Sequence, residues 1–332
     1  MSRSFRALVL AAFTAWPLAS SAAETPPPGA PSETPLRVVR TIPTGKWPEA
    51  VSVVGRSAYI ADSGDRRLLV IDLDTQATKS FRAGRLPTEL APVADGALLA
   101  LVETDKRIVR LDAGARKVRT LTRLPDCPDS MTVDGPTAYA LLWKACSSAG
   151  SQVVRVDLKS GKQRASAPLD ANASAIAAAG GRVYVAHSGG VVAVLDAETL
   201  ETRARWALPD VGSNLIATET AVFVTSGQDL ARVEATTGAV TARATLPAAA
   251  HVLALRDDRI YAALETGRVL VLAAANLMPV TALVPAGEPF RPTGLAFDGD
   301  RLLMTTFKID GVDAATSQGR LLVLEAGSAP AP

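Results

Sequence analysis

The sequence predicts an all-β protein, a seven-bladed β-propeller with four antiparallel strands in each blade. Three observations lead to this prediction. Short apolar runs that end in an acidic residue recur along the chain, their spacing is about 40 residues, and each period also holds two strand-like segments separated by a turn signal. A unit of this length leaves its apolar faces uncovered until neighbouring units stack on them, so the repeat indicates blades arranged in a ring.

The first period shows the pattern most clearly. Between Ala58 and Asp74, two apolar runs flank the polar turn 62–65, which predicts a pair of hydrogen-bonded strands. The acid-ending runs are Leu68–Asp72, Ile108–Asp112, Val153–Asp157, Val192–Asp196, Leu230–Glu234 and Leu321–Glu325, and Val269–Ala273 is a variant without the acid. We expect the first five acids, Asp72, Asp112, Asp157, Asp196 and Glu234, to accept hydrogen bonds from turn amides and not to form a functional row.

Each period also carries a tight turn between an inner strand and a second strand. The turns are Val54-Gly55, Asp95-Gly96, Asp134-Gly135, Gly180-Gly181, Asp257-Asp258 and Asp298-Gly299, with a weaker signal at 218–220. The acid-ending run is then the third strand. Outer strands are expected at segments such as Val118–Arg123, Thr202–Leu208 and Val240–Leu246.

The last period lacks an outer strand of its own, because the chain after Glu325 has too little apolar content for a strand. The segment Val38–Gly45 near the other end resembles the outer strand Val280–Gly287. We therefore expect this N-terminal segment to complete the seventh blade and close the ring, which also removes an unpaired edge.

The N-terminal residues have the pattern of a secretory signal peptide. Arg3 and Arg6 precede an apolar run over 7–19 and a group of small residues, so we expect cleavage after Ala23. The run is shorter than a membrane-spanning helix requires, although an N-terminal anchor is the alternative. The expected organisation is a signal peptide (1–23), a Pro-rich linker (24–36), the propeller (37–327) and a disordered tail (328–332), in a periplasmic or secreted protein without a membrane span.

The charge of the expected mature chain is balanced. Removal of Arg3 and Arg6 from the 35 Lys and Arg residues leaves as many basic residues as the 33 Asp and Glu residues. Capture of nucleic acid or of an anionic membrane would therefore depend on a local basic patch. Aromatic residues are sparse and do not alternate with Arg or Lys, so the sequence does not favour a nucleic-acid partner.

Three second-strand segments carry a family resemblance. The segments Ala58–Asp62, Val183–His187 and Val222–Ser226 resemble the motif of the YVTN-repeat family, which consists of exported bacterial seven-bladed β-propellers. The resemblance covers most of residues 37–327 and implies a binding protein or scaffold without a shared catalytic set. The Asn position of the motif is not retained, so the resemblance carries over no common ligand site. That position is occupied by Asp62, Val102, His187, Ser226, Leu264 and Thr306.

In such a ring, the loops that lead into the inner strands and the loops that join the second and third strands end at one mouth of the central channel. Converging polar groups there suit a peptide, a protein partner or a small molecule, whereas the alternative is that they satisfy exposed backbone and line a water-filled channel. The same loops place Thr88, Ser174 and Thr293 there, and the long loop 308–319 is either a partner contact or a disordered excursion. The candidate ligand-binding residues are Trp47, Glu49, Glu89, Asp129, Lys144, His187, Asn214, His251, Arg291 and Lys308.

No catalytic motif is present in the sequence. His187 and His251 are the only histidines and have no clustered acids at ligand spacing, so we expect no metal site. GxSxG, HExxH, a Gly-rich phosphate loop and CxxCH are all missing, so we expect no cofactor. The leading prediction is a monomeric, non-catalytic binding or scaffold module, and the alternative is a propeller enzyme such as a lactone hydrolase or a dehydrogenase subunit.

Cys127 and Cys146 are the only cysteines. A hairpin about residues 134–136 places them at nearly opposite positions, and export favours a disulfide between them. Such a bridge would stabilise the fold by about 3 kcal/mol before any strain. The alternative, a pair of redox-active thiols, lacks the CxxC spacing.

Overall fold

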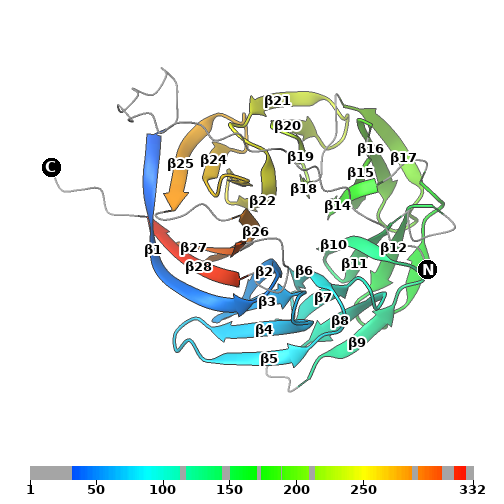
Figure 1. Cartoon of the computed structure of the whole chain (residues 1–332). Helices are drawn as coiled ribbons and strands as arrows, with labels where there is room; N and C mark the ends of the chain where they lie inside the picture. Colours follow the sequence, from blue (N-terminus) through cyan, green and yellow to red (C-terminus); the bar gives the residue numbers. More distant parts are fainter. Residues whose placement is uncertain are drawn as a thin grey trace, which may run out of the picture. The chain divides into compact units, whose positions relative to one another are not determined.

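The computed structural model describes residues 32–112, 117–143, 150–169, 173–187, 189–208, 214–285, 291–308 and 318–326. Within this part of the chain the secondary structure consists of β-strands, arranged as seven blades around a centre (Figure 1). No helix that could cross a membrane is found there. The expected signal peptide and the tail 328–332 lie outside the described residues.

The four strands of each blade follow one another outward from the centre of the ring. Blade 1 contains β2 (Pro48–Val54), β3 (Ser57–Asp62), β4 (Arg67–Asp72) and β5 (Thr78–Arg82). Blade 2 contains β6 (Pro87–Pro92), β7 (Leu98–Val102), β8 (Arg107–Leu111) and β9 (Arg119–Arg123). Blade 3 contains β10 (Pro128–Asp134), β11 (Thr137–Leu142), β12 (Gln152–Asp157) and β13 (Gln163–Ala165).

The remaining blades repeat this order. Blade 4 contains β14 (Ala173–Ala179), β15 (Arg182–His187), β16 (Val191–Asp196) and β17 (Thr202–Ala207). Blade 5 contains β18 (Leu215–Ala217), β19 (Ala221–Ser226), β20 (Asp229–Glu234) and β21 (Val240–Thr245). Blade 6 contains β22 (Ala250–Arg256), β23 (Arg259–Leu264), β24 (Val269–Ala273) and β25 (Pro279–Pro285). Blade 7 contains β26 (Arg291–Asp298), β27 (Arg301–Lys308), β28 (Gln318–Ala326) and β1 (Ser32–Gly45).

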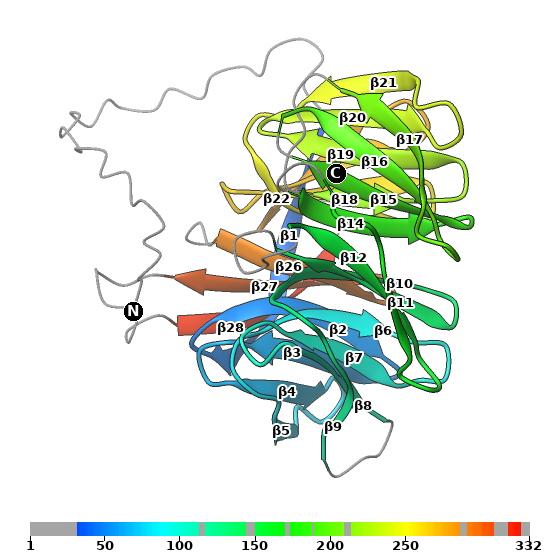
Figure 2. The same cartoon turned by 90° about the vertical axis from the view of Figure 1, so that its right-hand side faces the viewer.

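The predicted seven blades of four antiparallel strands are therefore confirmed. The weak turn of the fifth period is a hairpin, because the Thr218 amide donates to the Ala221 carbonyl at 2.8 Å. Figure 2 shows the ring of blades from the side.

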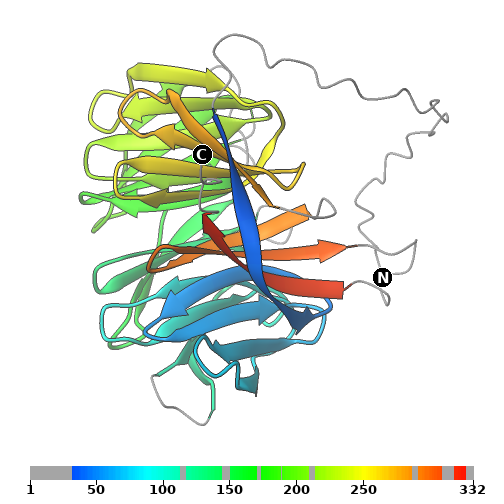
Figure 3. The same cartoon turned by 90° about the vertical axis from the view of Figure 1, so that its left-hand side faces the viewer.

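The N-terminal strand β1 closes the ring in two ways. From Leu36 onward it pairs with β28 in antiparallel fashion, which confirms the predicted completion of blade 7. Its first residues, 32–36, pair with β25 of blade 6 in parallel fashion, so blades 6 and 7 share one sheet (Figure 3). This second pairing was not predicted, and it begins inside the segment expected to be the linker. The sequence did not predict it because a parallel pair of strands is held by backbone hydrogen bonds, which do not require the apolar side-chain pattern that sequence analysis detects.

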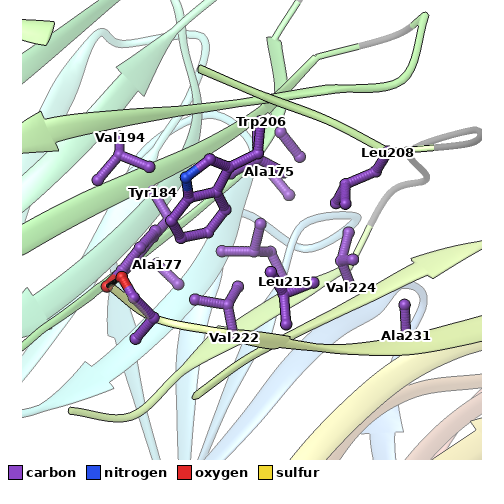
Figure 4. Packing of buried hydrophobic residues seen from close by; sticks show 14 residues of the cluster. Ala175, Ala177, Tyr184, Val194, Trp206, Leu208, Leu215, Val222, Val224 and Ala231 are labelled. Carbon is purple, nitrogen blue, oxygen red and sulfur yellow. Dashed lines mark hydrogen bonds between the residues drawn. The ribbon is translucent and has the colours of Figure 1, made fainter. Parts of the chain in front are cut away.

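The apolar core consists of clusters that lie between neighbouring blades. Between blades 4 and 5, Tyr184 and Trp206 pack with their ring centroids 5.5 Å apart, among small and branched apolar residues (Figure 4). The Tyr184 hydroxyl donates to the Ala235 carbonyl of blade 5 at 3.3 Å. Because each blade buries its faces against the next, the ring is stabilised as a unit.

Five acids at the ends of third strands were predicted to cap turns, and four of them do. The Thr199 amide lowers the pKa of Asp196 to about 2. Hydrogen bonds from Thr237 lower the pKa of Glu234 to about 2. Asp112 instead accepts hydrogen bonds from two arginine side chains, and the residues that follow it, 113–116, lie outside the described part of the chain. The acids that accept turn amides are Asp72, Asp157, Asp196 and Glu234.

Candidate functional site

The loops that lead into the inner strands and the loops that join the second and third strands meet at one end of the ring, here called the top face. In blade 1 the Ser63 amide of the joining loop donates to the Trp47 carbonyl of the leading loop at 2.8 Å. Four other blades have the equivalent bond, from Glu103 to Leu86, Trp143 to Cys127, Thr225 to Asn214 and Glu265 to Ala249. The predicted candidates on both kinds of loop therefore belong to the same face.

A β-bulge lies at the start of six of the seven inner strands. In blades 1, 2, 3, 4 and 6 the register shifts directly after the first paired residue, and in blade 7 it shifts after the second. The residue before the shift is a buried proline or alanine in all six blades. The extra residue is polar and partly exposed in every blade, and we call these six residues the bulge ring. They are Glu49, Thr88, Asp129, Ser174, His251 and Thr293. Bulges change the direction of a side chain and are frequent next to functional sites.

Three predicted candidates, Glu49, Asp129 and His251, belong to the bulge ring. Glu49 accepts a hydrogen bond at 2.9 Å from the Ser63 hydroxyl, which fixes its carboxylate against the joining loop. Burial lowers the pKa of His251, the positive charge of Arg291 lowers it further, and Glu265 opposes both effects. The structure thus brings His251 and the predicted Arg291 into electrostatic contact at the junction of blades 6 and 7.

Trp47 lies at the start of blade 1, with its ring centroid 6.5 Å from that of Phe307 in blade 7. Its indole Nε1 is buried and has no hydrogen-bond partner within the described part of the chain. The hydroxyls of Thr88, Thr293 and Thr306 are also buried and have no hydrogen-bond partner in that part of the chain. Blades 7, 1 and 2 therefore present neighbouring polar groups whose hydrogen-bonding capacity the fold itself does not use.

A repeated arginine clamp positions the leading loops of blades 1 and 2. Arg67 donates to the Thr44 carbonyl at 3.2 Å and to Asp62, which is 0% exposed, at 2.9 Å. Gly45, which follows Thr44 in the chain, has a φ of 112°, a conformation that favours glycine. In blade 2 the equivalent Arg107 donates to the carbonyl of residue 83 at 2.8 Å. Asp62 therefore has a structural role in holding the loop.

Glu89 does not occupy the bulge position, which belongs to Thr88. Its carboxylate extends across the junction of blades 2 and 3, where it accepts hydrogen bonds from the Met131 amide and the Ser130 side chain. Burial raises the pKa of Glu89 to about 7, because these hydrogen bonds only partly offset the loss of solvent. The signal that distinguishes the two positions is the residue directly after proline, as in Pro48-Glu49 and Pro87-Thr88.

The remaining candidates differ in their surroundings. His187, at the end of β15, is 1% exposed and belongs to the wall of blade 4. Asn214 donates to the Ala250 carbonyl at 3.0 Å and so links blade 5 to blade 6. Lys308 ends β27, and its side chain is outside the described atoms.

Two predicted features lie outside the described residues. Lys144 and Cys146 both belong to the segment 144–149, so the disulfide with Cys127 stays a prediction. Among the residues that are described, no three His, Cys, Asp or Glu side chains are grouped as metal ligands. The described part of the top face thus offers hydrogen-bond donors and acceptors together with charges of both signs.

Solved structures of other proteins have a similar fold. The structure resembles that of selenomethionine-substituted virginiamycin B lyase from Staphylococcus aureus, with a TM-score of 0.65, 16% sequence identity, and coverage of 85% of this chain and 98% of that chain. It also resembles a streptogramin B lyase, with a TM-score of 0.66, 12% identity, and coverage of 84% and 94%. At these identities the likeness shows the fold alone.

Sequence comparison is more specific about family. No curated protein matches the chain. The resemblance to the YVTN-repeat family stays a prediction. A family model described as outer membrane protein assembly factor BamB matches residues 128–318. Since this match extends over more than half of the residues, the chain belongs to the BamB family.

Proposed function

We propose that this protein is an exported, non-catalytic binding module that holds a segment of a protein partner at its top face. The bulge ring carries the proposal, because six blades direct a polar side chain to the same end of the ring. The ring mixes carboxylates, hydroxyls and an imidazole. A polypeptide segment presents amides, carbonyls and side chains of both charges, so its chemistry matches this mixture.

The unused polar groups of blades 7, 1 and 2 support a ligand with a hydrogen-bonding backbone. Trp47 Nε1 can donate to a carbonyl, and the hydroxyls of Thr88 and Thr293 can donate or accept. A bound peptide would satisfy these groups, which removes the cost of leaving them buried without a partner.

The family supports the choice of a protein partner. The matching family is described as an outer membrane protein assembly factor, and assembly of proteins requires contact with them. The same description and the signal peptide expected at residues 1–23 support a periplasmic location. The YVTN-repeat resemblance of segments such as Ala58–Asp62 also implies a binding or scaffold protein.

A propeller enzyme, such as a lactone hydrolase or a dehydrogenase subunit, is the second candidate. Glu89 favours it, because a carboxyl whose burial raises its pKa to about 7 can act as a general acid or base. Ser130 and Asp129 lie beside it. Turnover of a lactone or an alcohol that Glu89→Gln abolishes would support this candidate over the binding module.

Site-specific photo-crosslinking in the periplasm tests the proposal. A photo-reactive residue in place of the exposed Arg291 should crosslink the partner, and one in place of the exposed Glu219, in a turn at the opposite end of the ring, should not. Glu49→Gln combined with His251→Asn should lower the yield from position 291 about tenfold, which corresponds to about 1.4 kcal/mol.

The control pair is Glu219→Gln with Arg259→Gln, which changes two exposed residues at that opposite end. This pair should leave the crosslink from position 291 unchanged. Crosslinks from position 219 alone, or a yield from position 291 that the Glu49 and His251 changes do not affect, would place partner binding elsewhere.

A further inference from the structure

Arginines gather where blades 1 and 2 reach the outer edge of the top face. Arg82, at the end of β5, lies directly opposite Arg67 of β4. Arg123, at the end of β9, lies directly opposite Arg107 of β8. Like charges directly opposite each other destabilise a pair of strands. At the other end of blade 2 such a pair is compensated, because Asp112 accepts hydrogen bonds from both opposed arginines.

Only one arginine of each top-face pair is used by the fold. Arg67 and Arg107 are the clamp residues that hold the leading loops. Arg82 and Arg123 are exposed, and none of the acids in the described part of the chain forms an ion pair with them. The contacts within the fold therefore do not account for these two positive charges.

A polar pocket of about 380 Å³ lies beside Arg123. Asp105 in its wall is already paired, with Arg85 at 2.9 Å and Arg107 at 3.4 Å. Lys106 pairs with Asp126 at 3.0 Å. Cations outnumber acids in this pocket, since its lining residues are Arg85, Thr104, Asp105, Lys106, Arg107 and Arg123.

The positive charge continues from this pocket onto blade 1. The segment 82–85 crosses from blade 1 to blade 2, and the amides of Ala83 and Gly84 donate to the Arg66 carbonyl at 3.2 and 3.4 Å. The side chain of Arg66 is exposed, as are those of Arg82 and Arg85. We call the whole group the basic rim, which consists of Arg66, Arg82, Arg85, Lys106, Arg107 and Arg123.

We propose that the basic rim binds an acidic, Asp/Glu-rich segment of a polypeptide. Guanidinium groups pair with carboxylates through two parallel hydrogen bonds, and an extended acidic chain can reach cations on both blades at once. The rim contains no aromatic side chain on which bases could stack. The large exposed apolar residues of the described chain, Met278 and Val280, belong to blade 6, so the rim has no apolar anchor for a membrane.

This surface is distinct from the bulge ring. The rim involves the third and outer strands of blades 1 and 2 and the loop that crosses between these blades, whereas the bulge ring is formed by inner strands. The chain has 35 Lys and Arg against 33 Asp and Glu residues, so the rim is a local patch and not the result of a large net charge. Binding to it should therefore weaken steeply as salt screens the charges.

Fluorescence anisotropy with a labelled peptide of eight glutamates tests the proposal on the full chain at low salt. Wild type should bind this peptide, and addition of salt should weaken binding. Arg82→Glu combined with Arg123→Glu should weaken it at least tenfold. Both side chains are exposed and have no ion-pair partner in the described structure, and each glutamate would face an arginine of the neighbouring strand, so this variant should melt at or above the temperature of wild type.

The matched control is Arg243→Glu combined with Arg259→Glu, which reverses two exposed arginines on blades 5 and 6. This variant and Glu49→Gln with His251→Asn should both bind the peptide as wild type does, so failure of the rim and failure of the bulge ring are distinguishable. Absence of binding at low salt, or equal loss in the rim and control variants, would overturn the proposal. Rim-dependent binding of single-stranded DNA or of anionic phospholipid vesicles that is tighter than that of the peptide would overturn the choice of partner.

Discussion

Replacement of Glu89 by glutamine should remove a pH-dependent loss of stability from the ring. Burial raises the pKa of Glu89 from an ordinary value of 4.5 to about 7 in the folded protein. The folded chain therefore holds this proton more tightly than the unfolded chain. Between the two pKa values the native state binds more protons, so the free energy of unfolding falls as pH rises from 4.5 to about 7 and stays low above that.

The size of this effect follows from the two pKa values. Their difference corresponds to about 3 kcal/mol at pH 8, because each pKa unit corresponds to about 1.4 kcal/mol. Glutamine carries no charge at any of these pH values, and its amide oxygen can still accept the hydrogen bond from the Met131 amide. Glu89→Gln should thus lack the pH-dependent loss of stability but keep the hydrogen bond from the Met131 amide.

Urea unfolding at pH 5, 6, 7 and 8 measures this effect as the difference in the free energy of unfolding between Glu89→Gln and wild type. The stability of Glu89→Gln relative to wild type should rise by roughly 2–3 kcal/mol from pH 5 to pH 8, because a small part of the effect is already present at pH 5, and most of the change should be complete by pH 7. Glu219→Gln, which changes an exposed carboxylate, should show no such trend. A difference between Glu89→Gln and wild type that is constant with pH would refute the reasoning.

Three further predictions concern the ring itself. Deletion of residues 37–45 should lower the melting temperature sharply, because it removes the part of β1 that completes blade 7, and an unchanged melt would contradict this closure. Gly238→Ala should destabilise by about 2 kcal/mol or more in urea, because its Cβ would lie 2.4 Å from an indole ring, whereas Gly181→Ala shares the positive φ but meets nothing within 4 Å and should cost less. Intact mass of unreduced native protein should show Cys127 and Cys146 joined, and two free thiols would reject the bridge.

Much of the fold was predictable because the information is local and repeated. An acid at the end of a third strand, such as Asp196, is followed by a turn, and its carboxylate accepts a hydrogen bond from an amide of that turn. The same relation recurs at Glu234. Closure was predictable for the same reason, since Val38–Gly45 resembles an outer strand elsewhere in the chain.

The candidate site was predictable only as a face of the ring. Loop order alone assigned Glu49 and His251 to the top face, and both are members of the bulge ring. It did not distinguish Thr88 from Glu89, because a register shift of one residue decides which side chain is the extra residue of the bulge. Nor did it predict that His187 is 1% exposed, which depends on packing around the end of β15.

The sequence by itself determined the number of blades, the order of their strands and the strand that closes the ring, because short-range periodicity and turn residues specify these features. Only the tertiary structure decided the parallel pairing of β1 with β25, the burial of Glu89 against blade 3 and the assembly of the basic rim. These features depend on contacts between residues that are distant in sequence, such as Glu89 and Met131 or Arg85 and Asp105, and no local pattern encodes such contacts.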